Sequence, residues 1–255
     1  MTLLKLVFSV VSLAILSNNS YCQVGIGTNS PDPSSVLDLN SNIKGFLPPR
    51  MTFEERNNIA NPAAGLIVWC KNCWAKGELQ VYNGYEWTNL VGDIAKSPIK
   101  RGDLYGGGVV GYVYINGDPG FVEGETHGFV VKATNNVSLV WGCYTIELPG
   151  AESTLLGGGL QNTADIVNSC LTTGIAAHVC FYMIENGFSD WVLPSKDELA
   201  KMYLNRNYIQ GFQNTIYYSS SEDGPNAAWG QSFSTGNQVS VAKNISYNVR
   251  AIRYF

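Results

Sequence analysis

The sequence has few charged residues and almost no histidine. Aspartate, glutamate, lysine and arginine together make up 14% of the 255 residues, and the formal net charge is −4. A chain without a basic excess does not attract a polyanion, so a nucleic-acid partner is not expected. His127 and His178 are the only histidines. An isolated histidine is usually a surface or a satisfied core residue, so a Cys–His nucleophile with Cys143 or Cys180 is not favoured.

Long apolar runs are also scarce. The one near the N-terminus, residues 6–16, follows Lys5 and precedes a short polar stretch, which is the order found in a secretory signal peptide. This run is too short to span a bilayer, and no later run is long enough, so no transmembrane segment is expected after cleavage. Small residues three and one positions before the cut place cleavage between Cys22 and Gln23. A lipoprotein acylated at Cys22 is the alternative, although bulky Tyr21 stands where such a signal has a small residue.

Glycine and aromatic residues are abundant instead, with 27 glycines, 14 tyrosines and 6 tryptophans. Together with the signal peptide, this composition is typical of a loop-rich protein that is secreted or held at the cell surface. Five cysteines remain after the predicted cleavage, and an exported protein forms disulfides by default. We expect the bridges Cys70–Cys73 and Cys170–Cys180, which leave Cys143 unpaired. A Cys143–Cys170 bridge is the alternative, because connectivity cannot be read from sequence.

The pattern after the signal peptide predicts a small β-rich module followed by a larger domain. Thr52 and Glu55 form a capping box, and Asn83–Gly84 is a hairpin turn. In the module we expect a helix at 53–60 and strands at 35–39, 65–70, 78–82 and 85–90. The predicted organisation is a signal peptide at 1–22, the module at 23–92, a linker at 93–106 and the domain at 107–255.

The larger domain begins and ends with strand patterns and has helical patterns between them. A second capping box, Ser195 with Glu198, begins one of these helices. Strands are expected at 109–115, 129–132, 139–143, 216–220, 227–233, 239–242 and 249–255, and helices at 163–171, at 175–186 and after Ser195. Strands, then helices, then strands predict an α+β fold.

Four stretches of the module resemble a known family. They read GIGTNSP, LDLNSNIKGFLPPRMT, NPAAGLIVWC and LQVYNGYEWTNL. These words resemble an N-terminal module common in large paralogous sets of exported proteins of Gram-negative bacteria. The resemblance implies a stalk or assembly element, and with it a homo-oligomer formed through this module. The resemblance implies no catalytic or binding chemistry for this module.

The remainder, from about residue 107, resembles the Lcl-type C-terminal domain, named for a collagen-like bacterial adhesin. The residues that carry the resemblance are WGC at 141–143, NTA at 162–164, residues 175–180, SDWVLPSKDEL at 189–199, YSSSE at 218–222, AW at 228–229 and VRAIR at 249–253. It implies a C-type-lectin-like fold, shared with formylglycine-generating enzymes, and binding of glycans or glycosaminoglycans. The chain has neither a Glu-Pro-Asn nor a Trp-Asn-Asp triplet, so calcium is not supported, and we expect no cofactor and no metal.

The segment 217–229 is the candidate ligand-binding region, because it joins two aromatic strands through a polar loop. Sugars are bound by aromatic faces together with amide, carboxylate or guanidinium groups, as in other small-molecule sites. The candidates are Tyr218, Glu222, Trp229, Gln231, Asn244 and Arg250. Alternatively, Trp229 belongs to the core and Arg250 pairs with a carboxylate.

The motif at residues 189–199 is expected to be structural. Its key residues are Asp190, Trp191, Pro194, Ser195 and Glu198. The proline fixes a turn, the serine and glutamate cap a helix, and a buried tryptophan with its N–H paired anchors the segment.

An enzymatic function is not expected. The WCKNCW string at 69–74 invites a thioredoxin interpretation, but the helix that would acidify the first thiolate is missing. Zinc needs four ligands, and no second Cys or His pair is nearby. Formylglycine-generating enzymes use cysteines in their C-terminal part, and this chain has none after Cys180. The sequence therefore predicts a non-enzymatic, adhesin-like binding protein that contacts glycans or other extracellular polymers. The alternative is a structural subunit of a surface fibre that makes only protein contacts.

Overall fold

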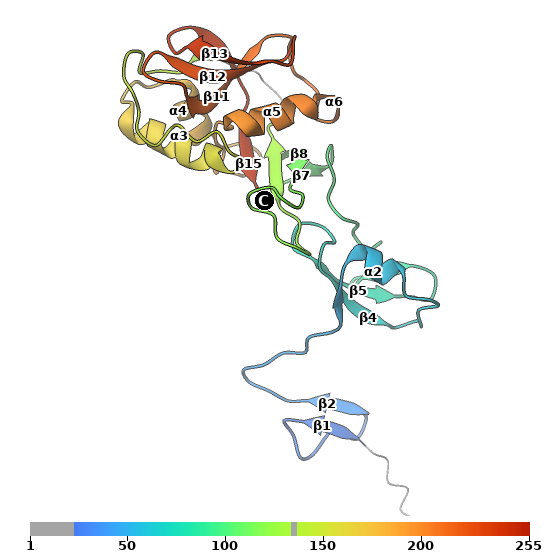
Figure 1. Cartoon of the computed structure of the whole chain (residues 1–255). Helices are drawn as coiled ribbons and strands as arrows, with labels where there is room; N and C mark the ends of the chain where they lie inside the picture. Colours follow the sequence, from blue (N-terminus) through green and yellow to red (C-terminus); the bar gives the residue numbers. More distant parts are fainter. Residues whose placement is uncertain (1–22, 134–136) are drawn as a thin grey trace, which may run out of the picture. The chain divides into compact units, whose positions relative to one another are not determined.

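The computed structural model describes residues 23–133 and 137–255, so the predicted signal peptide lies outside the described residues. Contacts divide the chain into two compact units between Pro48 and Pro49. The described part mixes helices with several β-sheets, as the α+β prediction requires (Figure 1). Within it, no helix is both long and apolar enough to cross a membrane.

The first unit is a short parallel pair of strands, β1 (Val24–Ile26) and β2 (Leu37–Leu39). The loop between them is held by Asp32, whose carboxylate accepts hydrogen bonds from the backbone N–H and the hydroxyl of Ser34, at 2.8 and 2.5 Å. Both apolar residues of β1, Val24 and Ile26, are exposed. This unit therefore has almost no core of its own.

The second unit begins with a four-stranded sheet in the order β3-β4-β5-β6. Its strands are β3 (Arg50–Met51), β4 (Ile67–Cys70), β5 (Glu78–Tyr82) and β6 (Trp87–Asn89). Helix α2 (Phe53–Asn57) connects the parallel pair β3 and β4, and the predicted capping box of Thr52 and Glu55 is confirmed. The helix ends three residues earlier than predicted, at Asn57, and β5 has the predicted bounds.

Two further sheets follow. An antiparallel sheet in the order β15-β9-β8-β7 contains β7 (Leu104–Tyr105), β8 (Gly108–Val113), β9 (Gly128–Val131) and β15 (Ile252–Tyr254). A five-stranded sheet in the order β10-β14-β11-β12-β13 contains β10 (Val137–Val140), β11 (Ile216–Glu222), β12 (Ala227–Ser232), β13 (Gln238–Ala242) and β14 (Ser246–Val249). The segment predicted to be a linker contains β7 and the buried side chain of Ile99.

Four helices pack beside these sheets (Figure 1). They are α3 (Gly158–Ser169), α4 (Ala176–Phe181), α5 (Lys196–Leu204) and α6 (Arg206–Ile209). One apolar cluster includes Trp141, Ile166 and Tyr218, and a second includes Phe129 and Leu199. Every residue of both clusters belongs to the second unit, so that unit holds the core of the described chain.

Two predicted elements at the C-terminal end of the fold need correction. The helix expected at 175–186 ends at Phe181. The strand expected at 249–255 is wrong, because the chain leaves β14 at Val249 and re-enters another sheet as β15 at Ile252. Between them, Arg250 turns its side chain inwards, where only 2% of it is exposed. A buried guanidinium must find acceptors, and this requirement interrupts the ladder.

The disulfides confirm one predicted bridge and correct the other. Cys70 is bonded to Cys73 as expected. The predicted Cys170–Cys180 bridge is wrong, because Cys170 is bonded to Cys143, with their Cα atoms 5.9 Å apart. Cys180 is a free thiol whose side chain is buried within α4, packed into the first apolar cluster. The alternative pairing stated from the sequence, Cys143 with Cys170, is therefore confirmed.

Candidate functional site

The structure buries most of the six predicted ligand-binding residues. Tyr218 is fully buried in β11, and its hydroxyl lies 2.6 and 2.8 Å from the carbonyl oxygens of Ala242 and Ile245. Burial raises the pKa of this hydroxyl above its ordinary value. Gln231 is also buried, and its amide donates a hydrogen bond to the carbonyl of Asn237. Both side chains thus have partners inside the fold.

Glu222 forms a buried ion pair with Lys243, and both side chains are 0% exposed. The carboxylate also accepts a hydrogen bond from the backbone N–H of Leu148, at 2.9 Å. The ammonium of Lys243 donates to the carbonyl of Ile146, at 2.9 Å, and lies over the ring of Trp141. A buried charge pair whose other hydrogen-bonding groups also have partners is a structural part of the interior.

Arg250 is held by backbone carbonyl groups. Its guanidinium donates to the carbonyl oxygens of Lys132, Gln210 and Ala133 at 2.8, 2.6 and 3.1 Å, and it lies over the ring of Phe212. The alternative that Arg250 pairs with a carboxylate is therefore wrong. Burial lowers the pKa of this guanidinium to about 10, and the electrostatic effect of Tyr217 opposes the shift without cancelling it.

Only Trp229 and Asn244 are accessible. Trp229 is half-buried on β12, with the ammonium of Lys196 3.2 Å from its ring centroid, and Asn244 is exposed between β13 and β14. The structure does not bring the six side chains to one open surface. Ligand binding by this group stays a prediction that depends on the two accessible residues.

The motif at 189–199 has the predicted cap. Ser195 and Glu198 form the capping box of α5, and both are fully buried. Asp190 accepts two hydrogen bonds from Arg253, at 2.6 and 2.7 Å, and these bonds lower the pKa of its carboxyl group. The indole N–H of Trp191 has no hydrogen-bond partner among the described residues, so the predicted pairing of this group is wrong.

Pro194 also has a structural contact. Its carbonyl accepts a hydrogen bond from the backbone N–H of Ser220, at 2.7 Å, which joins the motif to β11. The motif thus connects the helices with the five-stranded sheet.

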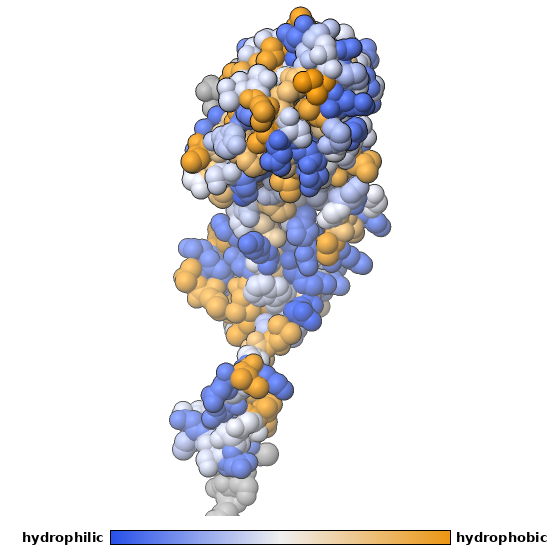
Figure 2. All heavy atoms as spheres, turned by 90° about the vertical axis from the view of Figure 1, so that its left-hand side faces the viewer, coloured by the Kyte–Doolittle hydropathy of each residue, from blue (hydrophilic) through white to orange (hydrophobic). Residues whose placement is uncertain are grey.

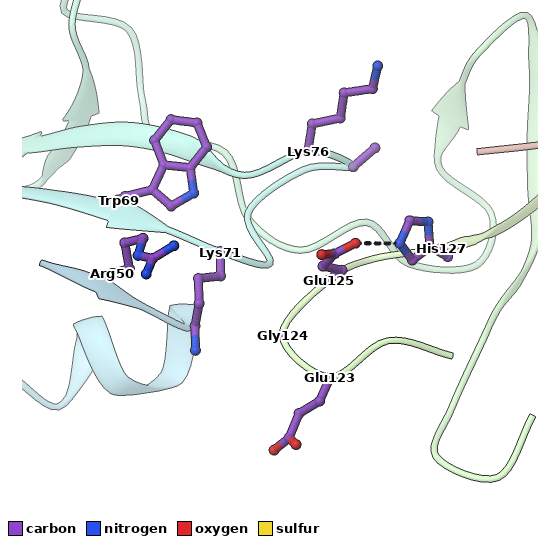
Figure 3. A pocket seen from close by; sticks show the side chains of 9 residues that line it. Arg50, Trp69, Lys71, Lys76, Glu123, Gly124, Glu125 and His127 are labelled. Carbon is purple, nitrogen blue, oxygen red and sulfur yellow. Dashed lines mark hydrogen bonds and ion pairs between the residues drawn. The ribbon is translucent and has the colours of Figure 1, made fainter. Parts of the chain in front are cut away.

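A pocket that the sequence did not predict lies elsewhere in the second unit. It has a volume of about 370 Å³. Its lining residues are Arg50, Trp69, Lys71, Ala75, Lys76, Glu123, Gly124, Glu125 and His127. Figure 3 shows Arg50, Trp69 and Lys71 on one side and Glu125 and His127 across from them. The walls come from segments about fifty residues or more apart in the sequence, which is why local patterns do not show it.

One wall is built by the parallel pair β3 and β4 and by the disulfide loop. Arg50 lies opposite Trp69 in the ladder, and Lys71 sits inside the loop closed by Cys70 and Cys73. The short loop fixes the position of its residues, because the disulfide joins its two ends.

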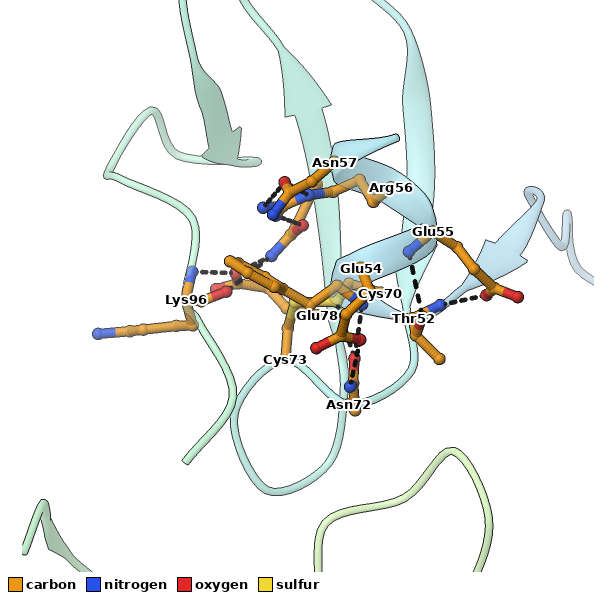
Figure 4. Close-up of a disulfide and its surroundings, with 12 residues drawn as sticks. Thr52, Glu54, Glu55, Arg56, Asn57, Cys70, Asn72, Cys73, Glu78 and Lys96 are labelled. Atoms are coloured by element: carbon orange, nitrogen blue, oxygen red, sulfur yellow. Dashed lines mark hydrogen bonds between the residues drawn. A yellow bond between two sulfur atoms is a disulfide. The ribbon is translucent and has the colours of Figure 1, made fainter. Parts of the chain in front are cut away.

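Asn72, at the tip of this loop, fastens it to helix α2 (Figure 4). Its side-chain oxygen accepts a hydrogen bond from the backbone N–H of Phe53, at 2.7 Å, and its amide donates to Glu54, at 3.2 Å. The hydrogen bond to Phe53 satisfies one of the free N–H groups at the start of a helix. The loop in this wall is therefore closed by its disulfide and joined to α2 by the hydrogen bonds of Asn72.

The other wall is the segment before β9. His127 and Glu125 are joined by a side-chain contact of 2.7 Å, and the hydroxyl of Thr126 donates to the carbonyl of Asn72, at 3.3 Å. Gly124 lies close to Lys71, since a Cβ atom built on this glycine would be 3.5 Å from the ammonium nitrogen of the lysine. The hydrogen bond from Thr126 to Asn72 joins the two walls.

The pocket combines both signs of charge around an indole. Among the described residues, no ion pair is formed by Arg50, Lys71 or Lys76. In the same part of the chain, no group of three or more His, Cys, Asp or Glu residues could hold a metal ion. The arrangement suits a polar or anionic organic ligand better than a cation.

Comparison with known proteins identifies a relation for the N-terminal part. No curated protein matches the chain. Residues 25–102 match the family model described as the phage tail like trimerisation region, so this part of the chain is similar to that region.

Proposed function

We propose that the protein is a trimeric structural subunit of a cell surface or appendage. Residues 25–102 assemble three copies, and the remainder of the chain is presented for contact with an extracellular polymer. The observation that carries the proposal is the match of residues 25–102 to a trimerisation region. The export signal predicted for residues 1–22 supports a location outside the cell.

The exposed apolar side chains of the first unit support assembly. Val36, Ile43 and Phe46 are 79%, 89% and 64% exposed. Orange residues lie on the surface of the small unit as well as on the larger one (Figure 2). An isolated two-stranded pair is at best marginally stable in water, and it gains stability when its apolar face is covered. In the proposed trimer, two further copies of the same segment cover this apolar face, in agreement with the family match.

A second group of exposed apolar residues falls within the matched region. It consists of Tyr85, Leu90, Val91 and Ile94, of which Val91 is 82% exposed. These residues surround the β5–β6 hairpin and the strand end that follows it. Exposed apolar residues that lie near one another are a feature of interfaces more than of monomers.

The contact function rests on the resemblance of residues 107–255 to the Lcl-type, C-type-lectin-like domain. That resemblance supports binding of glycans or other polymers. In the alternative, the same domain makes only protein contacts within a fibre. A glycan array distinguishes the two: specific signals favour the first, and none above background favours the second.

We also propose that the protein is not an enzyme and uses no cofactor. The CxxC string is followed by strand β5 and not by the helix that activates the first thiol in redox-active CxxC motifs. Burial raises the pKa of the Cys180 thiol to about 12, so it does not supply a thiolate nucleophile at neutral pH.

Sedimentation equilibrium of the chain beginning at Gln23 tests the assembly. We expect the mass of three chains. Ile43→Asp and Phe46→Asp place charges on the covered surface and should shift the mass towards one chain, whereas Asn42→Asp, which adds the same charge at an exposed polar position, should leave it unchanged. A single-chain mass for the unaltered protein would refute the proposal.

A further inference from the structure

The pocket at the disulfide loop has a cationic wall. Arg50, Lys71 and Lys76 line it, and none of the three is in an ion pair within the described residues. The chain as a whole carries a net charge of −4, so this group is a local reversal of sign. Cations around a concave surface raise the local concentration of anions. Arginine in particular matches a carboxylate with two parallel hydrogen bonds.

The facing wall has the opposite chemistry. Glu123 and Glu125 line it, and Glu125 is held by His127 at 2.7 Å. Ionised carboxylates only accept hydrogen bonds, so their natural partners in a ligand are hydroxyl or amide donors. A ligand that fits both walls has an anionic group on one side and donors on the other.

Between these walls the pocket has an apolar surface. Trp69 is half-buried, so part of its ring remains accessible, and Ala75 lies beside it. The volume of about 370 Å³ is in the range of small-molecule sites. An aromatic face with a few convergent polar groups suits the C–H face of a sugar ring.

We propose that this pocket binds a saccharide unit that bears a carboxylate, such as a uronic or a nonulosonic acid. The carboxylate faces the cationic wall, the hydroxyls donate to Glu123 and Glu125, and the ring lies against Trp69. The inference rests on the proposed contact function and deepens it, since it assigns an acidic sugar to a site on this chain. One wall of the site, residues 123–127, belongs to the part proposed for contact, and the other, residues 50–76, lies within the matched region 25–102.

Titration calorimetry of the chain beginning at Gln23 tests the ligand chemistry with three probes. Glucuronate should bind, and glucose, which has a hydroxymethyl group in place of the carboxylate, should bind at least about tenfold more weakly, because a charge-assisted hydrogen bond is lost. Affinity for glucuronate should fall with added salt. Equal binding of glucose, or equal binding of glutamate, would overturn the proposal; the second result would indicate an acidic peptide as the ligand.

Substitutions test the location. Lys71→Gln and Arg50→Gln should each lower the affinity for glucuronate about tenfold. Lys100→Gln makes the same change of charge at an exposed position outside this pocket and should leave the affinity unchanged. Unchanged binding in the first two variants would refute this site. The mass measured on the same samples separates this result from the assembly, because a chain that fails to trimerise can still bind the sugar, and a trimer can fail to bind it.

Discussion

Glu198 shows how a single buried carboxyl group links the fold to pH. It is fully buried and accepts hydrogen bonds from the N–H groups of Ser195 and Gly157 and from the hydroxyl of Tyr254, each at 2.7 Å. Burial raises the pKa of this carboxyl group, and the hydrogen bonds oppose the rise without cancelling it. The folded state therefore binds the proton more tightly than the unfolded state does. The contribution of this group to stability is greatest below the ordinary pKa of glutamate. It falls as the pH rises through the raised pKa that the group has in the folded state.

Replacing Glu198 by glutamine should remove this pH dependence. The free energy of unfolding of the native protein, minus that of Glu198→Gln, should decrease as the pH rises through that window. The variant should also lose about 1–3 kcal/mol, because its amide nitrogen faces backbone N–H donors. Urea unfolding at a series of pH values measures both effects, and Glu55→Gln in the exposed cap of α2 serves as the control. Parallel curves for the native protein and Glu198→Gln would contradict the assignment.

The thiol of Cys180 gives a second test at this scale. It is buried, and burial raises its pKa to about 12. A thiol reagent should therefore find no reactive group in the folded chain that begins at Gln23 at pH near 8, and one after unfolding without reductant. Peptide mapping should recover Cys143 joined to Cys170. Recovery of a peptide in which Cys180 is bridged would show that the pairing is different.

Residue type alone did not separate contact residues from structural ones. Tyr218, Glu222 and Arg250 have the chemistry of sugar-binding residues, yet each has its partners inside the fold. Sequence records the donors and acceptors but not their burial. The choice of Cys143 over Cys180 as the partner of Cys170 could not be predicted either, since it depends on which cysteines the fold brings together.

At the scale of elements, the features that depend on residues close together in the sequence were predicted correctly. The two capping boxes and strand β5 depend on neighbours within a few residues, and all three were predicted. The break between β14 and β15 depends on carbonyl groups of Lys132, Ala133 and Gln210 that accept hydrogen bonds from Arg250. These acceptors are 40 residues or more away in the chain, so no local pattern indicates them.

The two capping boxes should differ in their contribution to stability. The hydroxyl of Ser195 is buried, receives the N–H of Glu198 and donates to the carbonyl of Leu155 at 2.8 Å, so Ser195→Ala should cost about 2 kcal/mol. Thr52 caps an exposed helix of five residues, and Thr52→Ala should cost about 0.5 kcal/mol. Denaturant midpoints at an unchanged m-value measure the difference. Equal losses would mean that the contact with Leu155 contributes nothing.

At the scale of the whole molecule, a module at 23–92 and a following domain were predicted from composition and from resemblance. Contacts divide the chain elsewhere, between Pro48 and Pro49. The pocket joins Lys71 in the disulfide loop to Glu125 before β9, and only the folded chain brings these segments together. The only sign of the proposed assembly among the described residues of a single chain is a set of exposed apolar side chains, such as that of Ile43.

The proposed trimer predicts how stability depends on concentration. If three chains associate, association stabilises the folded state by mass action, so the thermal midpoint of the chain beginning at Gln23 should rise by about 2–4 °C for each tenfold increase in concentration. A chain beginning at Pro49 keeps both apolar clusters and should still unfold cooperatively, but it lacks the exposed segment that ends at Leu47, so its midpoint should depend much less on concentration. Calorimetry at two concentrations compares them. If the longer chain shows no dependence, its exposed apolar residues do not hold copies together; if the shorter chain shows the same dependence, the contacts lie instead around Leu90 and Val91.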